Sequence, residues 1–387
     1  MSRVLKPDSE DEVAQIVAEA ALDTTPIRIR GGGTRCPIGQ QHDGLVIDTT
    51  ALAGIGLYEP SEMIISARAG TPLSHVQQVL ADHGQMLPFD PMDHRPLLGT
   101  KGTPTIGGVA AGNISGSRRV TAGGARDHMI GVRLLNGRGE AIKSGGRVMK
   151  NVTGLDLVKL NAGALGTLGV LTEITFKVLP VPETRLTLCV EGQAPEAALN
   201  LMAAAMATPY EVTSSAYIPK TGTRTSSLTL FRLEGFLKSC RYRFARLVEH
   251  LRLCAPALEI EGHEEELIWT RVRDCHDLAE AGNTHVLRVH TAPSRAGSII
   301  KIATTNGIDF QIDWAGGLIW LGSGNGEKIE QVKSAIANAG GHPIHVRGDA
   351  RKRLLPAHPA IQVLGARIKT AFDPAGILNP GVLEGHV

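Results

Sequence analysis

Twelve consecutive residues, Thr105 to Gly116, carry four glycines, no charged side chain and nothing larger than isoleucine. Glycine reaches positive φ angles without steric penalty and lets a ligand lie directly against the backbone. Backbone N–H groups in such a segment bind phosphate or carbonyl oxygens without lysine or arginine. The composition therefore predicts a segment that lies under a ligand, although a tight turn packed in a crowded interior has the same composition.

Other segments would have to converge with this one to form a single site. Arg30-Gly31-Gly32-Gly33-Thr34 follows an alternating stretch typical of a strand, so its amides could surround a pyrophosphate. Two prolines fix φ within Leu87–Pro91 and make an extended, stiff connection. The remaining candidate segments are Gly123–Asp127, Lys150–Asp156 and Gly163–Thr172.

Several common ligand sites are excluded because their motifs are missing. No G-x-G-x-x-G occurs and no glycine is followed by lysine, so neither a Rossmann dinucleotide site nor a Walker A loop is supported. H-E-x-x-H and G-x-S-x-G are also missing, which leaves zinc-protease and α/β-hydrolase chemistry without support. Arg347–Asp349 and the basic Arg351–Arg353 are typical of a solvated loop and a helix start, so we expect no nucleic-acid partner.

The composition is that of an ordinary soluble protein with two domains. The chain has 387 residues, more than one ordinary core needs, and its net charge of +2 gives no reason to expect nucleic acid or an anionic membrane as partner. No apolar run approaches the roughly 18 residues of a transmembrane helix, and the polar N-terminus is not typical of a secretory signal. The five cysteines are scattered and form no CxxC pair, so we expect no metal site and a cytoplasmic location.

A change in glycine usage divides the chain. Residues 1–180 hold 26 of the 45 glycines, and Pro180 and Pro182 punctuate the point where this richness ends, so we place a domain border there. Ser9-Glu10-Asp11-Glu12 is a capping box that opens an amphipathic helix to about Ala21. Strand–helix alternation with glycine-rich connections favours an α+β fold over a doubly wound sheet. Strands are expected over 26–30, 45–48, 63–67, 132–135 and 169–177, and a helix over 73–83.

After the border the pattern becomes more regular. Apolar residues recur at spacings of three and four over 197–206 and 237–251, which predicts helices between strands. Two rounds of strand and helix predict a duplicated layer of sheet and helices, followed by a final helix over 361–368. The expected strands are 185–190, 212–218, 228–233, 286–289, 308–312 and 318–321, with a helix over 329–336.

Taken in order, the glycine segments resemble those of a known family. The chain is similar to flavoproteins of the vanillyl-alcohol oxidase and p-cresol methylhydroxylase (PCMH) type: Arg30–Thr34 matches the pyrophosphate loop, and Thr105–Gly116 the segment beneath the flavin. Gly163–Thr172 matches a later flavin-contacting strand, and Asp373–Gly381 the C-terminal return to the flavin domain. Finer matches resemble the FAD-binding E subunits of bacterial glycolate oxidases, and these are Gly84–Pro88, Val148–Asn151 and Ile312–Trp320.

The resemblance implies a two-lobed PCMH-type FAD-binding domain, an α+β cap domain and a C-terminal segment that packs back on the flavin domain. The implied limits are 1–182, 183–345 and 346–387. FAD would lie extended between the lobes with its ring facing the cap. It would be held without a covalent bond, because no histidine lies within 31–39 and His42 falls just outside this loop. The implied cofactor-binding residues are Arg30, Gly31, Gly32, Gly33, Thr34, Arg35, Pro88, Thr105, Gly107, Gly108, Ala111, Asn113, Gly116, Gly163, Thr167, Gly169, Val170 and Asn379.

In relatives of this type the flavin takes a hydride from the α-carbon of a 2-hydroxy acid, so the resemblance implies a small substrate of that class. An arginine suits the substrate carboxylate because its fork pairs bidentately. Arg118, Arg119 and Arg126 lie near the flavin-contacting segments and are the candidates, each with the alternative of an ordinary surface or ion-pairing arginine.

The chain departs from the family in its histidines. Hydroxy acid dehydrogenases of this superfamily carry a His-x-Gly-Asp-Gly-x-x-His motif, and His342 and His345 have neither its order nor its spacing. Pro343 and the β-branched neighbours favour a strand, on which the two histidines point to opposite faces, so we interpret them as structural. No residue is assigned a catalytic role, and no metal site is expected.

The resemblance also implies a complex with a second flavin subunit and an iron–sulfur subunit. This chain would hold FAD and take part in the oxidation of glycolate to glyoxylate, and electrons would leave through the iron–sulfur partner. It would be cytoplasmic or at the inner face of the membrane through the complex, without direct membrane insertion. The alternative is a self-sufficient FAD-dependent 2-hydroxy acid dehydrogenase of the D-lactate type, and the intact glycine segments disfavour a scaffold that has lost FAD.

Overall fold

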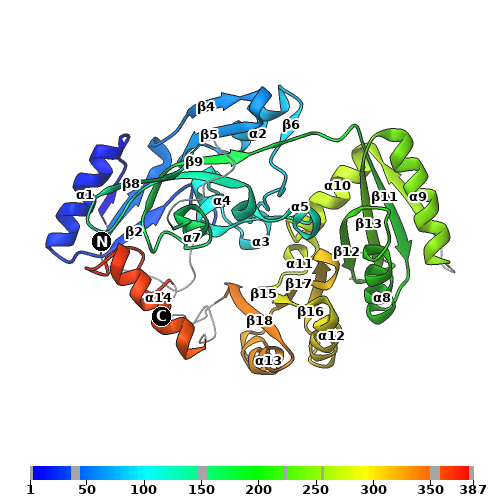
Figure 1. The fold of residues 1–387 in the computed structure, drawn as a ribbon. Helices are drawn as coiled ribbons and strands as arrows, with labels where there is room; N and C mark the ends of the chain where they lie inside the picture. The colour runs from blue at the N-terminus through cyan, green and yellow to red at the C-terminus, as the bar shows by residue number, and fades with distance from the viewer. Residues whose placement is uncertain are drawn as a thin grey trace.

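Two groups of sheets, one from each half of the chain, meet across the middle of the molecule (Figure 1). The computed structural model describes residues 3–35, 44–146, 155–220, 225–253, 257–348 and 358–382. Sheets of three, five and two strands come from the first half, and one sheet of eight strands comes from the second. The expected α+β fold is confirmed. Several segments named above lie wholly or partly outside the described residues: 31–39, His42, Val148–Asn151, Lys150–Asp156, Arg347–Asp349 and Arg351–Arg353.

A small parallel sheet in the order β1-β3-β2 lies near the N-terminus. The Ser9 hydroxyl accepts a hydrogen bond from the Glu12 amide at 3.3 Å, so the helix that follows β1 begins where the capping box predicts. That helix buries Val13 and Val17 in the same apolar cluster as Ile27, which fixes the position of the strand that leads into the first glycine loop. The elements are β1 (Arg3–Leu5), α1 (Glu10–Leu22), β2 (Ile27–Arg30) and β3 (Leu45–Asp48).

The second sheet is antiparallel, in the order β4-β5-β9-β7-β8. Its strand β9 lies between β5 and β7, and the short helix α4 packs across β9 and β5. β7 and β8 form a hairpin, and Gly139 has a φ of 77° in the turn that joins them. The elements are β4 (Ile55–Glu59), β5 (Ile64–Arg68), α2 (Leu73–Ala81), α4 (Ile106–Gly112), β7 (Met129–Leu135), β8 (Ala141–Gly145) and β9 (Val170–Lys177).

Short elements fill the connections. Strands β6 and β10 form a two-stranded antiparallel sheet. No helix in the described ranges has the length and apolar character needed to cross a bilayer. The bounds are η1 (Thr49–Ala51), η2 (Pro60–Glu62), β6 (Gln85–Met86), α3 (Arg95–Leu98), α5 (Arg119–Ala122), α6 (Ala125–His128), α7 (Leu157–Asn161) and β10 (Leu179–Pro180).

The second half is one eight-stranded sheet in the order β14-β11-β13-β12-β16-β17-β15-β18. Each four-strand half of it is a β-α-β-β-α-β unit with its first strand flanked by its third and fourth, and the two units join where Tyr217 of β12 pairs with Ile312 of β16. The duplicated layer expected from the sequence is therefore confirmed. The first unit has β11 (Thr184–Glu191), α8 (Pro195–Met206), β12 (Val212–Ile218), β13 (Leu228–Gly235), α9 (Leu237–Leu251) and β14 (Ala257–Glu261). Between the units lie α10 (Gly262–Arg273) and α11 (His276–Glu280). The second unit has β15 (His285–Thr291), η3 (Pro293–Arg295), α12 (Ala296–Thr305), β16 (Asp309–Asp313), η4 (Trp314–Gly316), β17 (Leu318–Ser323), α13 (Gly326–Asn338) and β18 (Gly341–Arg347).

The C-terminal part returns to the first half, where α14 (Pro359–Phe372) lies beside the N-terminal elements (Figure 1). The carboxylate of Asp373 is 1% exposed and accepts hydrogen bonds from the amides of Ile377 at 3.1 Å and Leu378 at 2.7 Å. It also accepts a hydrogen bond from the Lys369 ammonium at 2.5 Å. These bonds fold the segment after α14 into a turn that places Leu378 beside Ile27.

We keep 1–182, 183–345 and 346–387 as proposed domain limits. The change from the five-stranded to the eight-stranded sheet between β9 and β11 supports the first border. The second is less sharp, because β18 continues to Arg347.

The Asp373 turn gives a stability prediction. Asp373→Ala removes three hydrogen bonds and leaves the partly buried Lys369 ammonium without its carboxylate, so we expect a loss of about 3 kcal/mol in the free energy of unfolding, measured in urea. Glu249→Ala is the control, because Glu249 pairs with Arg246 at the same 2.5 Å but is exposed on α9, a helix that lies across the molecule from α14 (Figure 1). The control should lose less than about 1 kcal/mol; equal losses would contradict the assigned role of Asp373.

Candidate functional site

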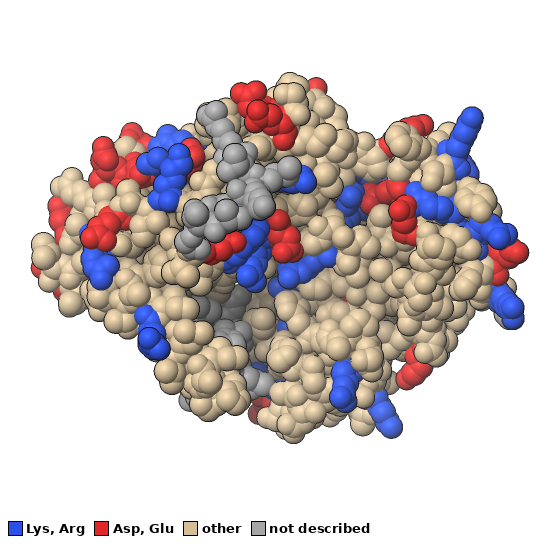
Figure 2. Space-filling model, viewed as in Figure 1, with Lys and Arg blue, Asp and Glu red and all other residues tan. Residues whose placement is uncertain are grey.

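A cavity of about 370 Å³ lies where the glycine segments of the first half face the edge of the eight-stranded sheet. Basic and acidic side chains lie next to each other where the two halves meet on the face shown in Figure 2. Most of its lining is backbone and small or apolar side chains, with four arginines and two histidines among the lining residues. Such a lining suits an elongated ligand with an anionic part. The arginines are Arg28, Arg30, Arg35 and Arg288, and the histidines are His94 and His345.

The first wall is the loop after β2. A Cβ built on Gly32 would lie 1.6 Å from the Thr103 carbonyl oxygen, so only glycine lets this loop approach the chain before α4. Gly33 has a φ of 71°, a left-handed conformation that glycine adopts without penalty. Within the described part of the chain the amides of Gly32 and Gly33 have no backbone partner, so they can donate to a ligand. Phosphate oxygens match this arrangement.

The second wall is α4, where the sequence left open a ligand-bearing segment or a crowded turn. The Thr105 hydroxyl accepts a hydrogen bond from the Gly108 amide at 3.3 Å and caps a helix of seven residues. A Cβ on Gly107 would meet the Ala69 carbonyl oxygen at 2.6 Å, so Gly107 allows close packing on the chain after β5. A Cβ on Gly108 would meet only the Thr105 hydroxyl, at 3.3 Å, and Gly108 lines the cavity. The segment therefore does both things: one glycine packs the interior, and the next leaves room for a ligand.

The third wall joins the segment before β9 to the C-terminal turn. The Leu165 amide donates to the Ala111 carbonyl at 2.9 Å, which holds this segment on the end of α4. Asn379 accepts a hydrogen bond from the Ile29 amide at 2.8 Å and donates to the Leu165 carbonyl at 2.7 Å. Asn379, at a φ of 42°, thus connects β2 to the segment before β9, and it lines the cavity with both.

The structure brings together most of the cofactor-binding residues expected from the sequence. Five others lie in the same segments but are not among the residues that line the cavity: Pro88, Asn113, Gly116, Thr167 and Val170. Asn113 ends α4 at a φ of 48°, and Gly116 donates to the Phe89 carbonyl at 2.8 Å. Lining the cavity are Arg30, Gly31, Gly32, Gly33, Thr34, Arg35, Thr105, Gly107, Gly108, Ala111, Gly163, Gly169 and Asn379.

The three arginines proposed for the substrate lie elsewhere. Arg118 forms a buried ion pair with Glu234 at 2.8 Å, across the contact between the two halves. The Arg119 guanidinium lies 4.9 Å from the centre of the Trp314 ring, and Arg126 is exposed. None of the three is among the lining residues, whereas Arg288 of β15 is. Sequence reasoning missed Arg288 because it stands in an ordinary strand with no glycine motif near it.

The two histidines of β18 lie on a strand, as expected, and only His345 is buried. Its Nε2 lies 2.6 Å from a carboxylate oxygen of Glu330, and the neighbouring Lys333 ammonium is 3.2 Å from the same carboxylate. Burial and the Lys333 charge lower the pKa of His345 to about 4, so the ring is neutral near pH 7. His345 therefore packs against α13, although it also reaches the lining of the cavity.

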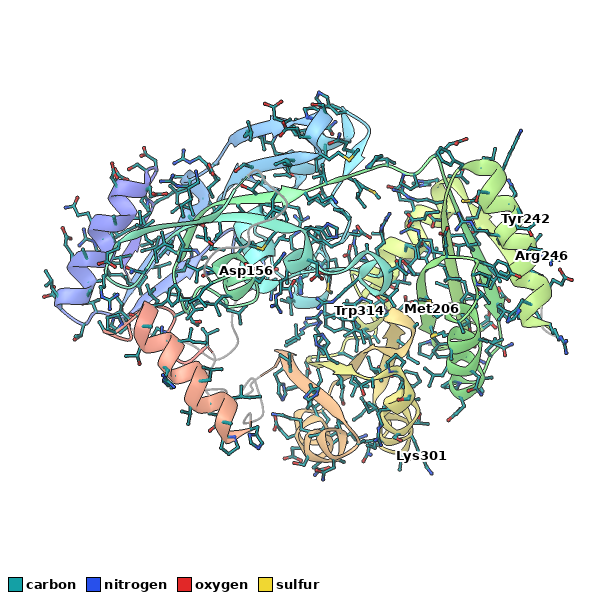
Figure 3. All side chains as sticks on the ribbon, in the orientation of Figure 1. Asp156, Met206, Tyr242, Arg246, Lys301 and Trp314 are labelled. Atoms are coloured by element: carbon teal, nitrogen blue, oxygen red, sulfur yellow. The ribbon has the colours of Figure 1, made fainter. Side chains whose placement is uncertain are left out.

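Asp313 is a buried acid at the contact between the halves. It is 2% exposed, accepts a hydrogen bond from the Ser117 hydroxyl at 2.8 Å and directly precedes Trp314, which lies near the centre of the molecule (Figure 3). Burial raises its pKa to about 7, and the nearby Asp90 charge adds to this shift. Next to Asp313, the Trp314 indole N–H donates a hydrogen bond at 2.9 Å to the Gly116 carbonyl of the first half.

Comparisons with known proteins agree with this geometry. The family model of the FAD binding domain matches residues 1–145. Glycolate oxidase subunit GlcE of Escherichia coli K12 is 31% identical over 381 residues, which cover 97% of this chain and 97% of that protein. Glycolate oxidase subunit GlcD of Bacillus subtilis 168 is 29% identical over 269 residues, which cover 68% of this chain and 54% of that protein. Among solved structures, an alkyldihydroxyacetonephosphate synthase matches with a TM-score of 0.69 and 17% identity, over 97% of this chain and 76% of that chain, which shows a shared fold.

The buried acid predicts a pH dependence. Between pH 4 and 7 the folded protein holds a proton on Asp313 that the unfolded chain has released, so this residue makes stability fall as the pH rises through that window. An asparagine at position 313 binds no proton in the folded or the unfolded state, so Asp313→Asn removes this pH-dependent contribution to stability. We expect the stability of the variant relative to the unaltered protein to increase by about 2–3 kcal/mol from pH 5 to pH 8 and to stay level above that. A difference that does not change with pH, in urea unfolding at each pH, would contradict the raised pKa.

Proposed function

Because the chain belongs to the family of glycolate oxidase GlcE subunits, we propose that it holds FAD in its glycine-lined cavity and takes part in the oxidation of glycolate to glyoxylate. The observation that carries this proposal is the glycine-lined wall of the cavity. A methyl group on Gly108 would have no neighbour closer than 3.3 Å, and the amides of Gly32 and Gly33 are available to phosphate oxygens within the described chain. A long cofactor with a pyrophosphate and a flat ring fits such a lining.

We propose that the lining residues of the first half hold the cofactor. The Gly31–Thr34 loop would bind the pyrophosphate, since its amides and the nearby Arg28, Arg30 and Arg35 offer donors and positive charge. The bare backbone of α4 and of the segment around Gly163 would lie against the ring. FAD, when bound, supplies the two-electron acceptor for a substrate C–H bond. The chain itself would orient the ring and exclude water from it.

We further propose that this chain works as one subunit of a larger enzyme. Its partners would be a second flavin subunit and an iron–sulfur subunit, because the sequence has no cysteine pattern for a cluster and electrons must leave the flavin through another carrier. The complex would bring the chain to the inner face of the membrane.

A second candidate function rests on one observation. The eight-stranded sheet contributes Arg288 to the cavity, so the chain has a cationic group of its own on the side that a substrate would approach. This arrangement favours a self-sufficient 2-hydroxy acid dehydrogenase of the D-lactate type as the alternative.

The visible spectrum of the full chain tests both proposals. We expect the purified protein to be yellow and to release FAD on denaturation, because nothing covalent is proposed. Addition of glycolate without oxygen should bleach the flavin of the assembled complex. Bleaching of the isolated chain by glycolate or D-lactate would favour the self-sufficient enzyme, and a colourless protein in both preparations would contradict FAD binding.

Gly108→Val tests directly whether the cofactor lies against the glycine-lined wall of the cavity. The valine methyls would project into the cavity, so we expect at least a tenfold loss of bound FAD per chain, measured by absorbance after gel filtration. Folding should change little, because the new Cβ meets only a hydroxyl that can rotate. Gly324→Val is the matched control, since a Cβ there meets nothing within 4 Å, and it should retain FAD. Normal FAD content in Gly108→Val would contradict the proposed position of the cofactor.

A further inference from the structure

One lysine of the C-terminal helix joins two segments that line the cavity. Lys369 lies in the last turn of α14, and its side chain is 22% exposed. Its ammonium donates to the Asp373 carboxylate at 2.5 Å and to the Leu378 carbonyl at 2.8 Å, both in the turn that follows α14. It also donates to the Thr167 carbonyl at 2.8 Å, in the segment before β9. An ammonium has three N–H donors, so these three acceptors account for all of them.

Both segments belong to the third wall of the cavity. The segment before β9 contributes Gly163, Leu165, Gly166 and Gly169 to the lining, and the C-terminal turn contributes Asn379. The two segments touch there. The Asn379 side chain donates to the Leu165 carbonyl at 2.7 Å, and a Cβ on Gly166 would lie 2.8 Å from the Asn379 side-chain nitrogen. A small shift of either segment would therefore change the shape of the wall.

The segment before β9 has a conformation that needs support from its surroundings. Leu165 has a φ of 54° and Gly166 a φ of 72°. A residue with a side chain adopts this left-handed region at a cost and stays there where neighbouring groups hold it. The Leu165 carbonyl is held by Asn379, and two residues further on the Thr167 carbonyl is held by Lys369. Asn379 and Lys369 therefore support the two sides of this turn.

Lys369 supports the wall from behind. It is not among the described residues that line the cavity, and the carboxylate of Asp373, which is 1% exposed, balances its charge. An ammonium paired in this way exerts only a weak net force on an anion further away. Its effect on a ligand therefore comes through the positions of the two segments that it joins.

We propose that Lys369 is a positioning residue for FAD, which holds the segment before β9 and the C-terminal turn in the arrangement that the cofactor requires. The inference rests on the proposed function, because it needs FAD in the glycine-lined cavity. It extends the cofactor site to parts of the chain beyond residues 1–145, which the FAD binding domain model matches. Lys369 acts through these two segments and not by contact with the cofactor.

The test titrates the FAD-free full chain with FAD. The change in flavin fluorescence gives the dissociation constant, and the visible circular dichroism of the bound flavin reports how the ring is held. Lys369→Met keeps the length of the side chain and removes its donors. We expect it to weaken FAD binding at least about tenfold, as loss of one hydrogen bond to a charged group does, and to change the dichroism at saturating FAD. Lys369→Arg, which keeps the charge and the donors, should bind FAD at least about threefold more tightly than Lys369→Met.

Lys159→Met is the matched control. The Lys159 ammonium also donates to three backbone carbonyls, those of Arg126 at 2.6 Å, Asp127 at 3.3 Å and Met129 at 2.9 Å. These three residues are not among the described residues that line the cavity, so the control should leave the dissociation constant of FAD within about twofold. If Lys369→Met does not fold, as judged by urea unfolding, Lys369→Gln and Lys159→Gln take the place of this pair.

Equal weakening by Lys369→Met and Lys159→Met would assign the effect to a general loosening of the first half and overturn the inference. A smaller loss of affinity in Lys369→Met, or no recovery in Lys369→Arg, would overturn it as well. In each of these cases FAD binding by the unaltered chain still stands. An unaltered chain that binds no FAD would contradict the proposed function, and the inference with it.

Discussion

The cavity depends on stretches of backbone that approach each other more closely than any side chain allows. Gly32 and Gly102 are the clearest case: a Cβ on either would lie within 1.6 Å of a carbonyl oxygen of the other stretch. Gly107 does the same against the chain after β5. These contacts bring two loops that are about seventy residues apart into one wall and leave their remaining amides facing the cavity. Replacing these glycines would change the shape of the wall before it changed any contact with a ligand.

Polar contacts between the two halves hold the eight-stranded sheet against the other side of the cavity. Arg273 pairs with Asp90 at 3.0 Å, and Asp274 accepts a hydrogen bond from the Asp93 amide at 2.8 Å. The Trp314 indole donates to the chain just after α4. These ion pairs and hydrogen bonds require specific geometries and lie where water is excluded, so they fix the orientation of the eight-stranded sheet. That orientation decides which residues of β15 and β18 reach the ligand.

Local patterns predicted the elements well because they depend on neighbours in sequence. The capping box starts α1, the three-four spacing gives α9, and the duplicated order of strands and helices appears as two β-α-β-β-α-β units. The seven-residue helix α4 was missed, because its three glycines have low helix propensity and its stability comes from packing on β9 and β5. Asn379 was expected only by resemblance, since its bonds join residues 214 and 350 positions away.

The sequence by itself determined an α+β fold with a glycine-rich first half, a duplicated layer of sheet and helices in the second half, and glycine segments suited to phosphate oxygens, because these depend on residue type and near neighbours; the flavin ring was expected by resemblance. It could not decide which arginine faces the cavity. Arg118, Arg119 and Arg126 lie close to the glycine segments in sequence, yet one pairs with Glu234, one lies over Trp314, and one is exposed. Arg288 lies 172 positions beyond Gly116. Only the register of β15 against β17 and β18, and the docking of that sheet on the first half, turn it toward the same cavity.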